Sequence, residues 1–148
     1  MSIPKLKDLL NERDFHLTKP PRKVGGVAIV SEGQILLVKR SETAGKYPNF
    51  WSVPSGGVED GETFREGATR ELKEETMLDF NPQKLVYLGT IKDGKYNRIS
   101  KIYKAEMDGK PEPTLDHEHS DWGYYDKDSL PRPIEDRMRQ ILELNLWV

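Results

Sequence analysis

Two β-rich runs on either side of Ser31-Glu32-Gly33 constrain the fold more than any other feature, because they predict a hairpin and therefore a sheet. A second pair of such runs flanks Asp93-Gly94, which is a strong turn pair for a hairpin. Helical patterns lie before, between and after these pairs. Since strands and helices interleave along the chain, the sequence predicts an α/β or α+β fold built on a mixed sheet.

The predicted elements can be placed from periodicity and turn residues. Strands are expected at residues 24–30, 34–40, 51–53, 84–91, 97–106 and 122–125, and helices at 3–13, 62–77 and 134–146. Adjacent prolines make residues 17–23 a connector, and residues 41–50 and 108–120 are expected to be loops.

Length and composition narrow the classes of protein. The 148 residues suit one domain, with an N-terminal helix and connector in residues 1–22. The 23 basic and 25 acidic side chains leave a net charge of −2, which argues against a general polyanion binder. The absence of cysteine excludes a disulfide scaffold, a thiolate metal site and a cysteine nucleophile. With no apolar run near the ~20 residues of a membrane span and no secretory signal, we expect a cytoplasmic protein that does not enter membranes.

Residues 62–77 carry the pattern that points to chemistry. On a helical wheel at about 100° per residue, the apolar side chains form one stripe: Phe64, Ala68 and Leu72. Glu75 and Glu71 fall on or beside this stripe, and Glu74 adjoins them. The opposite face is predicted to be solvated and carries four residues: Arg65, Thr69, Lys73 and Thr76.

A cluster of three carboxylates that faces the protein must take up protons or bind a cation. Magnesium and manganese accept carboxylate, carbonyl and water oxygens. Ser55-Gly56-Gly57 allows a sharp turn that could bring carbonyl groups to the same ion, and Thr63 could cap the helix. Arg70 lies beside Glu74 and can bridge to carboxylates or phosphate. The alternative is a solvated helix rich in ion pairs, but the position beside the apolar stripe favours a metal site.

Two other patterns resemble functional motifs. Gly89–Lys95 nearly spells a phosphate-binding loop, but residue 96 is tyrosine and a strand follows, so a hairpin is favoured. His117 and His119 flank Glu118 but lack the spacing of a helical zinc motif and an evident third ligand, so loop histidines are favoured.

The stretch from Gly56 to Leu78 resembles the Nudix box, G-x5-E-x7-R-E-U-x-E-E-x-G-U, in which U is a bulky aliphatic residue. The matching positions are Gly56, Glu62, Arg70, Glu71, Leu72, Glu74, Glu75 and Leu78. Met77 stands where the family has a glycine that ends the helix in a left-handed conformation. The helix end is therefore expected to have a different shape or to run on.

This resemblance implies a Nudix-type α/β/α sandwich that uses Mg2+ or Mn2+ to hydrolyse the pyrophosphate bond of a nucleoside diphosphate linked to another moiety. It implies Glu74 and Glu75 as metal ligands, Glu71 as a ligand or the base, and the Ser55 carbonyl as a further ligand. Arg70 would hold the glutamates in place, and Glu62 would either support the ligands from behind or be an outer ligand itself. Glu118 fits a late-loop glutamate that serves as ligand or base, although a solvated loop carboxylate is an equal interpretation.

The substrate is less well encoded. The resemblance allows a nucleotide sugar, a dinucleoside polyphosphate or a nucleoside triphosphate, and a 5′ RNA end stays open although large RNA is disfavoured. Lys39 and Arg40 are candidates to meet phosphate, and Gly56 and Gly57 to contact substrate. Four aromatic residues could stack on a base or sugar, with the core favoured for the two tryptophans: Tyr47, Phe50, Trp51 and Trp122.

Two further points stay open at this stage. A Nudix-like module that senses a nucleotide without cleaving it is the competing class, and the intact glutamates disfavour it. Many family members dimerise, so a homodimer is open, with the N-terminal segment either as a dimerisation element or as a cover for one sheet face.

Overall fold

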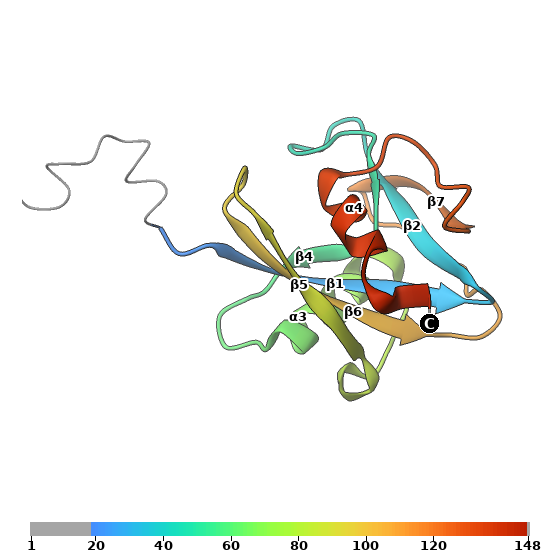
Figure 1. Ribbon diagram of the computed structural model, residues 1–148, viewed down its shortest axis with the longest axis horizontal. Coiled ribbons are helices and arrows are strands. Elements are labelled where there is room, and N and C mark those ends of the chain that lie inside the picture. Colours follow the sequence, from blue (N-terminus) through green and yellow to red (C-terminus); the bar gives the residue numbers. More distant parts are fainter. Residues whose placement is uncertain (1–18, 148) are drawn as a thin grey trace, which may run out of the picture.

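The computed structural model describes residues 19–147, so the helix predicted at 3–13 lies outside the described part of the chain. Within that part, seven strands form one sheet (Figure 1). The strands are β1 (Arg22–Ser31), β2 (Gln34–Arg40), β3 (Trp51–Ser52), β4 (Ser55–Gly57), β5 (Val86–Asp93), β6 (Arg98–Glu106) and β7 (His119–Tyr125). The helices are α3 (Phe64–Thr76), α4 (Asp136–Leu142) and two 3-10 turns, η1 (Pro82–Lys84) and η2 (Asn145–Trp147).

The sheet is mixed, as predicted. Its main order is β3-β2-β1-β6-β5, with β4 also paired to β1 and β7 to β2. β1 and β6 run parallel over nine residue pairs from Arg22↔Arg98 to Val30↔Glu106, and the other strand pairs are antiparallel. The parallel pair matters for function because it places Arg22, at the start of β1, beside Arg98, at the start of β6.

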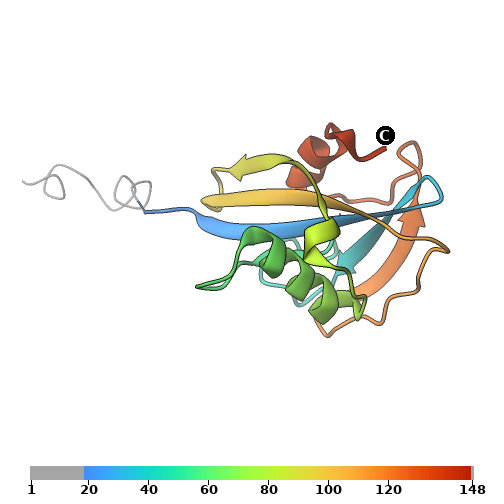
Figure 2. The same ribbon diagram turned by 90° about the horizontal axis from the view of Figure 1, so that it is seen from below.

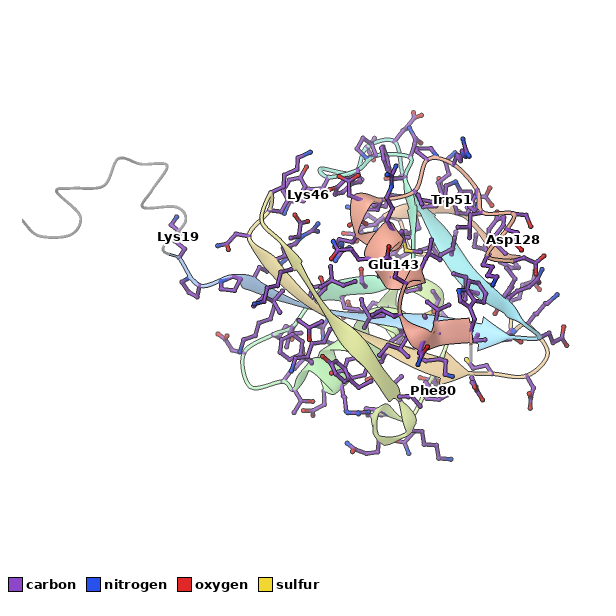
Figure 3. The ribbon with its side chains drawn as sticks, in the orientation of Figure 1. Lys19, Lys46, Trp51, Phe80, Asp128 and Glu143 are labelled. Atoms are coloured by element: carbon purple, nitrogen blue, oxygen red, sulfur yellow. The ribbon has the colours of Figure 1, made fainter. Side chains whose placement is uncertain are left out.

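Helices cover both faces of the sheet and make an α/β/α sandwich (Figure 2). On one face, α3 contributes Ala68 and Leu72 to an apolar cluster. On the other face, α4 and η2 contribute Met138, Ile141 and Leu146 to a second cluster, which also contains Trp51 (Figure 3). The core interpretation of Trp51 is thus confirmed, and Trp122 packs against the first cluster. None of the helices in residues 19–147 is long and apolar enough to cross a bilayer.

Both predicted hairpins are present. β1 and β2 pair through Ser31↔Gln34, and Glu32 and Gly33 take positive φ angles of 51° and 78° in the two-residue turn between them. The β5–β6 hairpin closes at Asp93↔Arg98, which confirms the hairpin interpretation of the segment that resembles a phosphate-binding loop.

Several element boundaries differ from the prediction, and one strand was not predicted. The first strand begins at Arg22, inside the predicted connector. The C-terminal helix is shorter than residues 134–146, because α4 ends at Leu142 and the chain continues into η2. The strand β4 was not predicted, since its three residues Ser55–Gly57 carry no apolar alternation. It exists because its backbone pairs with β1 through Gly25↔Gly56.

Close packing holds α3 against this part of the sheet. A Cβ atom on Gly25 would lie 2.8 Å from the Phe64 carbonyl oxygen and 2.9 Å from the Ala68 amide nitrogen. Only glycine lets the helix backbone approach β1 this closely. The acidic face of α3 is therefore set directly beside β4.

Candidate active site

Helix α3 begins as the sequence predicts. The Thr63 hydroxyl accepts a hydrogen bond from the Glu66 amide at 3.1 Å, and the Glu66 carboxylate accepts one from the Thr63 amide at 3.0 Å. This reciprocal capping box fixes the first turn. The start and rotation of the helix are thereby defined, and with them the direction in which its glutamates point.

The helix end corrects the expectation drawn from Met77. Met77 itself adopts the left-handed conformation, with φ 61° and ψ 13°, and its amide donates to the Lys73 carbonyl at 2.8 Å. The helix stops where a glycine would stop it and keeps the same shape. The Met77 side chain points outward and is 56% exposed, so no packing obstructs this conformation.

We expect Met77→Gly to raise the free energy of unfolding by about 0.5–1 kcal/mol, because relief of left-handed strain exceeds the added flexibility of glycine in the unfolded chain. Urea denaturation of the metal-free protein measures this. Thr69→Gly is the matched control: in the middle of the same helix, glycine should lower stability by about 0.5 kcal/mol. Equal losses in both variants would contradict the prediction.

The three glutamates differ in burial as the helical wheel indicates. Glu75 is 3% exposed, Glu71 is half-buried and Glu74 is exposed. Thr76 is an exception, since it was predicted to be solvated and is fully buried. Its hydroxyl donates to the Leu72 carbonyl at 2.6 Å, and its own carbonyl accepts from the Thr114 amide at 2.8 Å. The loop before β7 therefore covers the end of α3.

The loop also brings a buried histidine to Glu75. His119 Nε2 lies 3.3 Å from Glu75 Oε1, and His119 Nδ1 lies 2.8 Å from Asp116 Oδ1. His119 is the first residue of β7 and is buried, so the interpretation of it as a loop histidine is wrong. His117, by contrast, lies in the loop and is exposed.

Burial makes the charge of Glu75 unfavourable in the metal-free protein. Burial is the largest cause that raises the pKa of Glu75 well above 4.5, and repulsion from Glu71, Asp116 and Glu118 adds to it. The Glu75 Oε2 atom has no hydrogen-bond partner among the described residues. Burial also raises the pKa of Glu71, against the opposing effect of Arg70.

This raised pKa has a consequence for stability. Because folded Glu75 holds its proton more tightly than unfolded Glu75, its contribution is favourable below about pH 4.5 and is lost as the pH rises toward the folded-state pKa. In EDTA we expect Glu75→Gln to gain more than about 1 kcal/mol of unfolding free energy over the wild type between about pH 5 and pH 8. Urea denaturation across this range is the measurement. Glu112→Gln, at an exposed loop position, should show a constant difference, and a constant difference for Glu75→Gln would contradict the prediction.

Arg70 connects the carboxylates. Its guanidinium donates to Glu62 at 2.8 and 3.0 Å, to the Gly57 carbonyl at 2.8 Å, to Glu71 at 3.1 Å and to Glu74 at 3.2 Å. The hydrogen bonds from Arg70 are also the main cause of the lowered pKa of Glu62. Arg70 thus ties the helix to β4 and is placed to hold the glutamates.

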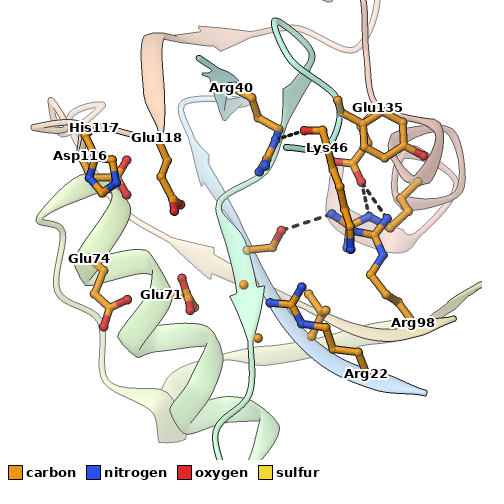
Figure 4. A pocket seen from close by; sticks show the side chains of 16 residues that line it. Arg22, Arg40, Lys46, Glu71, Glu74, Arg98, Asp116, His117, Glu118 and Glu135 are labelled. Atoms are coloured by element: carbon orange, nitrogen blue, oxygen red, sulfur yellow. Dashed lines mark hydrogen bonds and ion pairs between the residues drawn. The ribbon is translucent and has the colours of Figure 1, made fainter. Parts of the chain in front are cut away.

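A pocket of about 550 Å³ opens beside these residues and has two walls of opposite charge (Figure 4). Residues Ser55, Gly56 and Gly57 of β4 lie between the walls. The acidic wall, so called below, consists of Glu71, Glu74, Asp116 and Glu118. The basic wall consists of Arg22, Arg40, Lys46, Arg98 and Arg137.

Most of the sequence-predicted site residues line this pocket. Those that do are Arg40, Ser55, Gly56, Gly57, Glu71, Glu74 and Glu118. Arg70 and Glu75 do not line it: Arg70 contacts Glu71 and Glu74, and Glu75 is buried beside His119. Lys39, which precedes Arg40 on β2, does not line it either.

Sequence reasoning missed most of the basic wall. Arg22 and Arg98 are directly paired across β1 and β6, although 76 positions separate their numbers. Arg98 forms an ion pair with Asp93 at 2.5 Å, and Glu135 receives hydrogen bonds from both Arg98 and Arg137. Arg98 lies in a strand and Arg137 in a helix, and the sequence patterns of these two elements indicate no function beyond folding. The one available signal was Arg137, which is a buried charge on an otherwise apolar helix face.

The donor set of the acidic wall fits a hard divalent cation, because all four of its side chains supply carboxylate oxygens. The unpartnered Oε2 of buried Glu75 is a further acceptor that lacks a positive partner. Among residues 19–147, no three acidic or histidine side chains already converge into a complete metal cage. Carboxylates on flexible side chains would have to close around the ion.

Comparison with known proteins agrees with this fold. The family described as "NUDIX domain" matches residues 19–144. The chain is 32% identical over 83 residues to the nucleoside triphosphatase NudI of Salmonella typhimurium, over 51% of this chain and 59% of that protein. It is 33% identical over 94 residues to a Nudix hydrolase of Nostoc sp., over 62% of this chain and 56% of that protein.

A solved structure is also similar. The crystal structure of a MutT NUDIX hydrolase from Burkholderia pseudomallei superposes with a TM-score of 0.76 at 27% identity, over 86% of this chain and 99% of that one. The chain therefore belongs to the Nudix family. It spans less than two thirds of the length of the curated relatives named above.

Proposed function

We propose that this protein hydrolyses the pyrophosphate bond of a nucleoside diphosphate derivative with the help of Mg2+ or Mn2+. The observation that carries the proposal is the arrangement of charge in the pocket, where carboxylates from α3 and the loop before β7 face cations across β4. A nucleotide's phosphate groups complexed with divalent ions carry both kinds of charge, with cations to face the acidic wall and anionic oxygens to face the basic wall. Membership of the Nudix family supports the same reaction class.

The reaction requires one bond to form and one to break. A water oxygen bonds to a phosphorus of the pyrophosphate, the bridging P–O bond breaks, and the leaving phosphate keeps the electron pair while the water loses a proton. Bound divalent ions would neutralise phosphate charge and lower the pKa of the attacking water. In this proposal Glu74 and Glu75 hold the ions together with the Ser55 carbonyl.

Other residues of the chain position the reacting groups. Glu71 and Glu118 face the same space from opposite sides, and each is placed to serve as a further ligand or to accept the proton from water. Arg70 keeps Glu71 and Glu74 in place through its hydrogen bonds. Tyr47 is the aromatic residue at the pocket and offers a ring to a base or sugar.

A substrate panel tests the proposal. ATP, ADP-glucose and diadenosine tetraphosphate are incubated separately with the protein and Mg2+ or Mn2+, and phosphate and nucleoside monophosphate are measured. Calorimetry with Mn2+ then measures metal uptake. We expect turnover of at least one compound and loss of that turnover in EDTA. Nucleotide binding without turnover would indicate a sensing module instead, and absence of metal uptake would contradict the proposed metal site.

A further inference from the structure

Three cations of the basic wall have no acidic partner within residues 19–147. Arg98 and Arg137 are neutralised by Asp93 and Glu135. Within the described residues, Arg22, Arg40 and Lys46 form no ion pair with a carboxylate. Their charges therefore remain available to a ligand in the pocket that all three line.

Arg40 and Lys46 have contacts that position them at the pocket, and Arg22 lies against β4. The Arg40 guanidinium donates through Nε to the Lys46 carbonyl at 2.6 Å, which fixes the loop that carries Lys46. The Lys46 ammonium lies 4.8 Å from the centre of the Tyr96 ring, at the β5–β6 turn. Arg22 lies so close to β4 that a Cβ on Gly57 would be 2.8 Å from its Nη2. The cations converge from three segments on one space.

Without a ligand, the cations of the basic wall repel one another. Partial burial and the charges of Arg98, Arg22 and Arg40 lower the pKa of Lys46, and among the nearby groups Asp93 opposes this. Cations gathered in this way indicate a site for an anion with several negative charges. Guanidinium groups suit phosphate in particular, because their paired N–H groups match two phosphate oxygens.

We propose that the pocket takes a nucleotide that carries a chain of three or more phosphates, with the phosphate beyond the metal-bound pair lying against Arg22, Arg40 and Lys46. This inference rests on the proposed hydrolase function. In that function, divalent ions on the acidic wall engage the two phosphates that flank the bond to be cleaved. A nucleotide sugar would place neutral hydroxyl groups against three unpaired cations, whereas a longer phosphate chain brings the matching charge.

Two substrates that share adenosine and its first two phosphates test the inference. We expect kcat/KM with Mg2+ to be about tenfold or more higher for ATP than for ADP-glucose. Arg22→Gln and Lys46→Gln should each lower kcat/KM for ATP about tenfold or more and leave that for ADP-glucose within about threefold. Lys92→Gln, an exposed substitution on β5 away from the pocket, should change neither value. A short RNA with a 5′-triphosphate, run beside ATP, distinguishes a free nucleotide from an RNA end as the source of the chain.

A binding measurement separates this inference from the proposed function. Calorimetry in EDTA with inorganic tripolyphosphate reports on the basic wall without metal or turnover, and we expect Arg22→Gln and Lys46→Gln to weaken binding about tenfold or more. If the wild-type protein turns over none of the substrates but both variants weaken tripolyphosphate binding, the proposed hydrolase function is overturned and the polyphosphate site is kept. Two results would overturn the inference without contradicting the hydrolase function. One is a kcat/KM for ADP-glucose that equals or exceeds that for ATP. The other is an equal loss of kcat/KM for both substrates in the variants. Without turnover, tripolyphosphate binding unchanged by both variants would also overturn it.

Discussion

Glu75→Gln should abolish most hydrolysis while the protein stays folded, with kcat/KM reduced on the order of 10³-fold. The substitution keeps the shape of the side chain and removes a negative charge that is 3% exposed and lies near three other carboxylates. The fold loses an unfavourable charge, whereas the proposed metal site loses a ligand. Activity and stability should therefore move in opposite directions, as is common where a site is built at the expense of the fold.

Steady-state kinetics and thermal melting of the metal-free protein measure the two effects. We expect a melting temperature equal to or above that of the wild type. Calorimetry should show weaker Mn2+ uptake by the variant, which attributes the kinetic loss to the metal. Glu112→Gln is the control, because it removes the same charge from an exposed loop position. Near-normal turnover by Glu75→Gln would remove Glu75 from the proposed set of ligands.

Gly56→Ala should lower kcat/KM about 100-fold with little change in stability. A Cβ on Gly56 would overlap the Glu71 carboxylate, which has to move out of its present position beside β4. Because this carboxylate is the flexible end of a side chain, it can move without disturbing the sheet, and we expect the free energy of unfolding to change by less than about 1 kcal/mol. The loss in rate would come from a displaced catalytic group.

A double-mutant cycle identifies this cause. The shorter side chain of Glu71→Asp retracts the carboxylate from residue 56, so Gly56→Ala should lower kcat/KM by a smaller factor in that background than in the wild type. Gly94→Ala is the control, since, apart from Gly94 and its two chain neighbours, no described residue has a heavy atom within 4 Å of a Cβ at that position. Equal factors in both backgrounds would show that the loss does not pass through Glu71.

The parts of the fold that depend on residues close together in the sequence were predictable. Helix α3, its Thr63 cap and the inward direction of Glu71 and Glu75 follow from the period of an α-helix. The two hairpins follow from their turn residues. The helical part of the acidic wall could therefore be described before the structure, because Glu71 and Glu74 come from one helix.

The basic half depends on contacts between distant segments. The pairing of Arg22 with Arg98 requires a parallel register that no local pattern specifies. The burial of Thr76 and His119 has the same origin, because the loop before β7 covers the end of α3. A helical wheel treats a helix as isolated and so places Thr76 in solvent.

The left-handed backbone at Met77 bears on how members of this family are recognised. A search that demands glycine at this position would discard the present chain, although its helix ends with the same turn. The requirement lies in the backbone angle rather than in the residue type, and a bulky side chain satisfies it when it can point away from the protein. Divergent members that carry other residues at this position therefore deserve inspection by conformation before they are classed as degenerate.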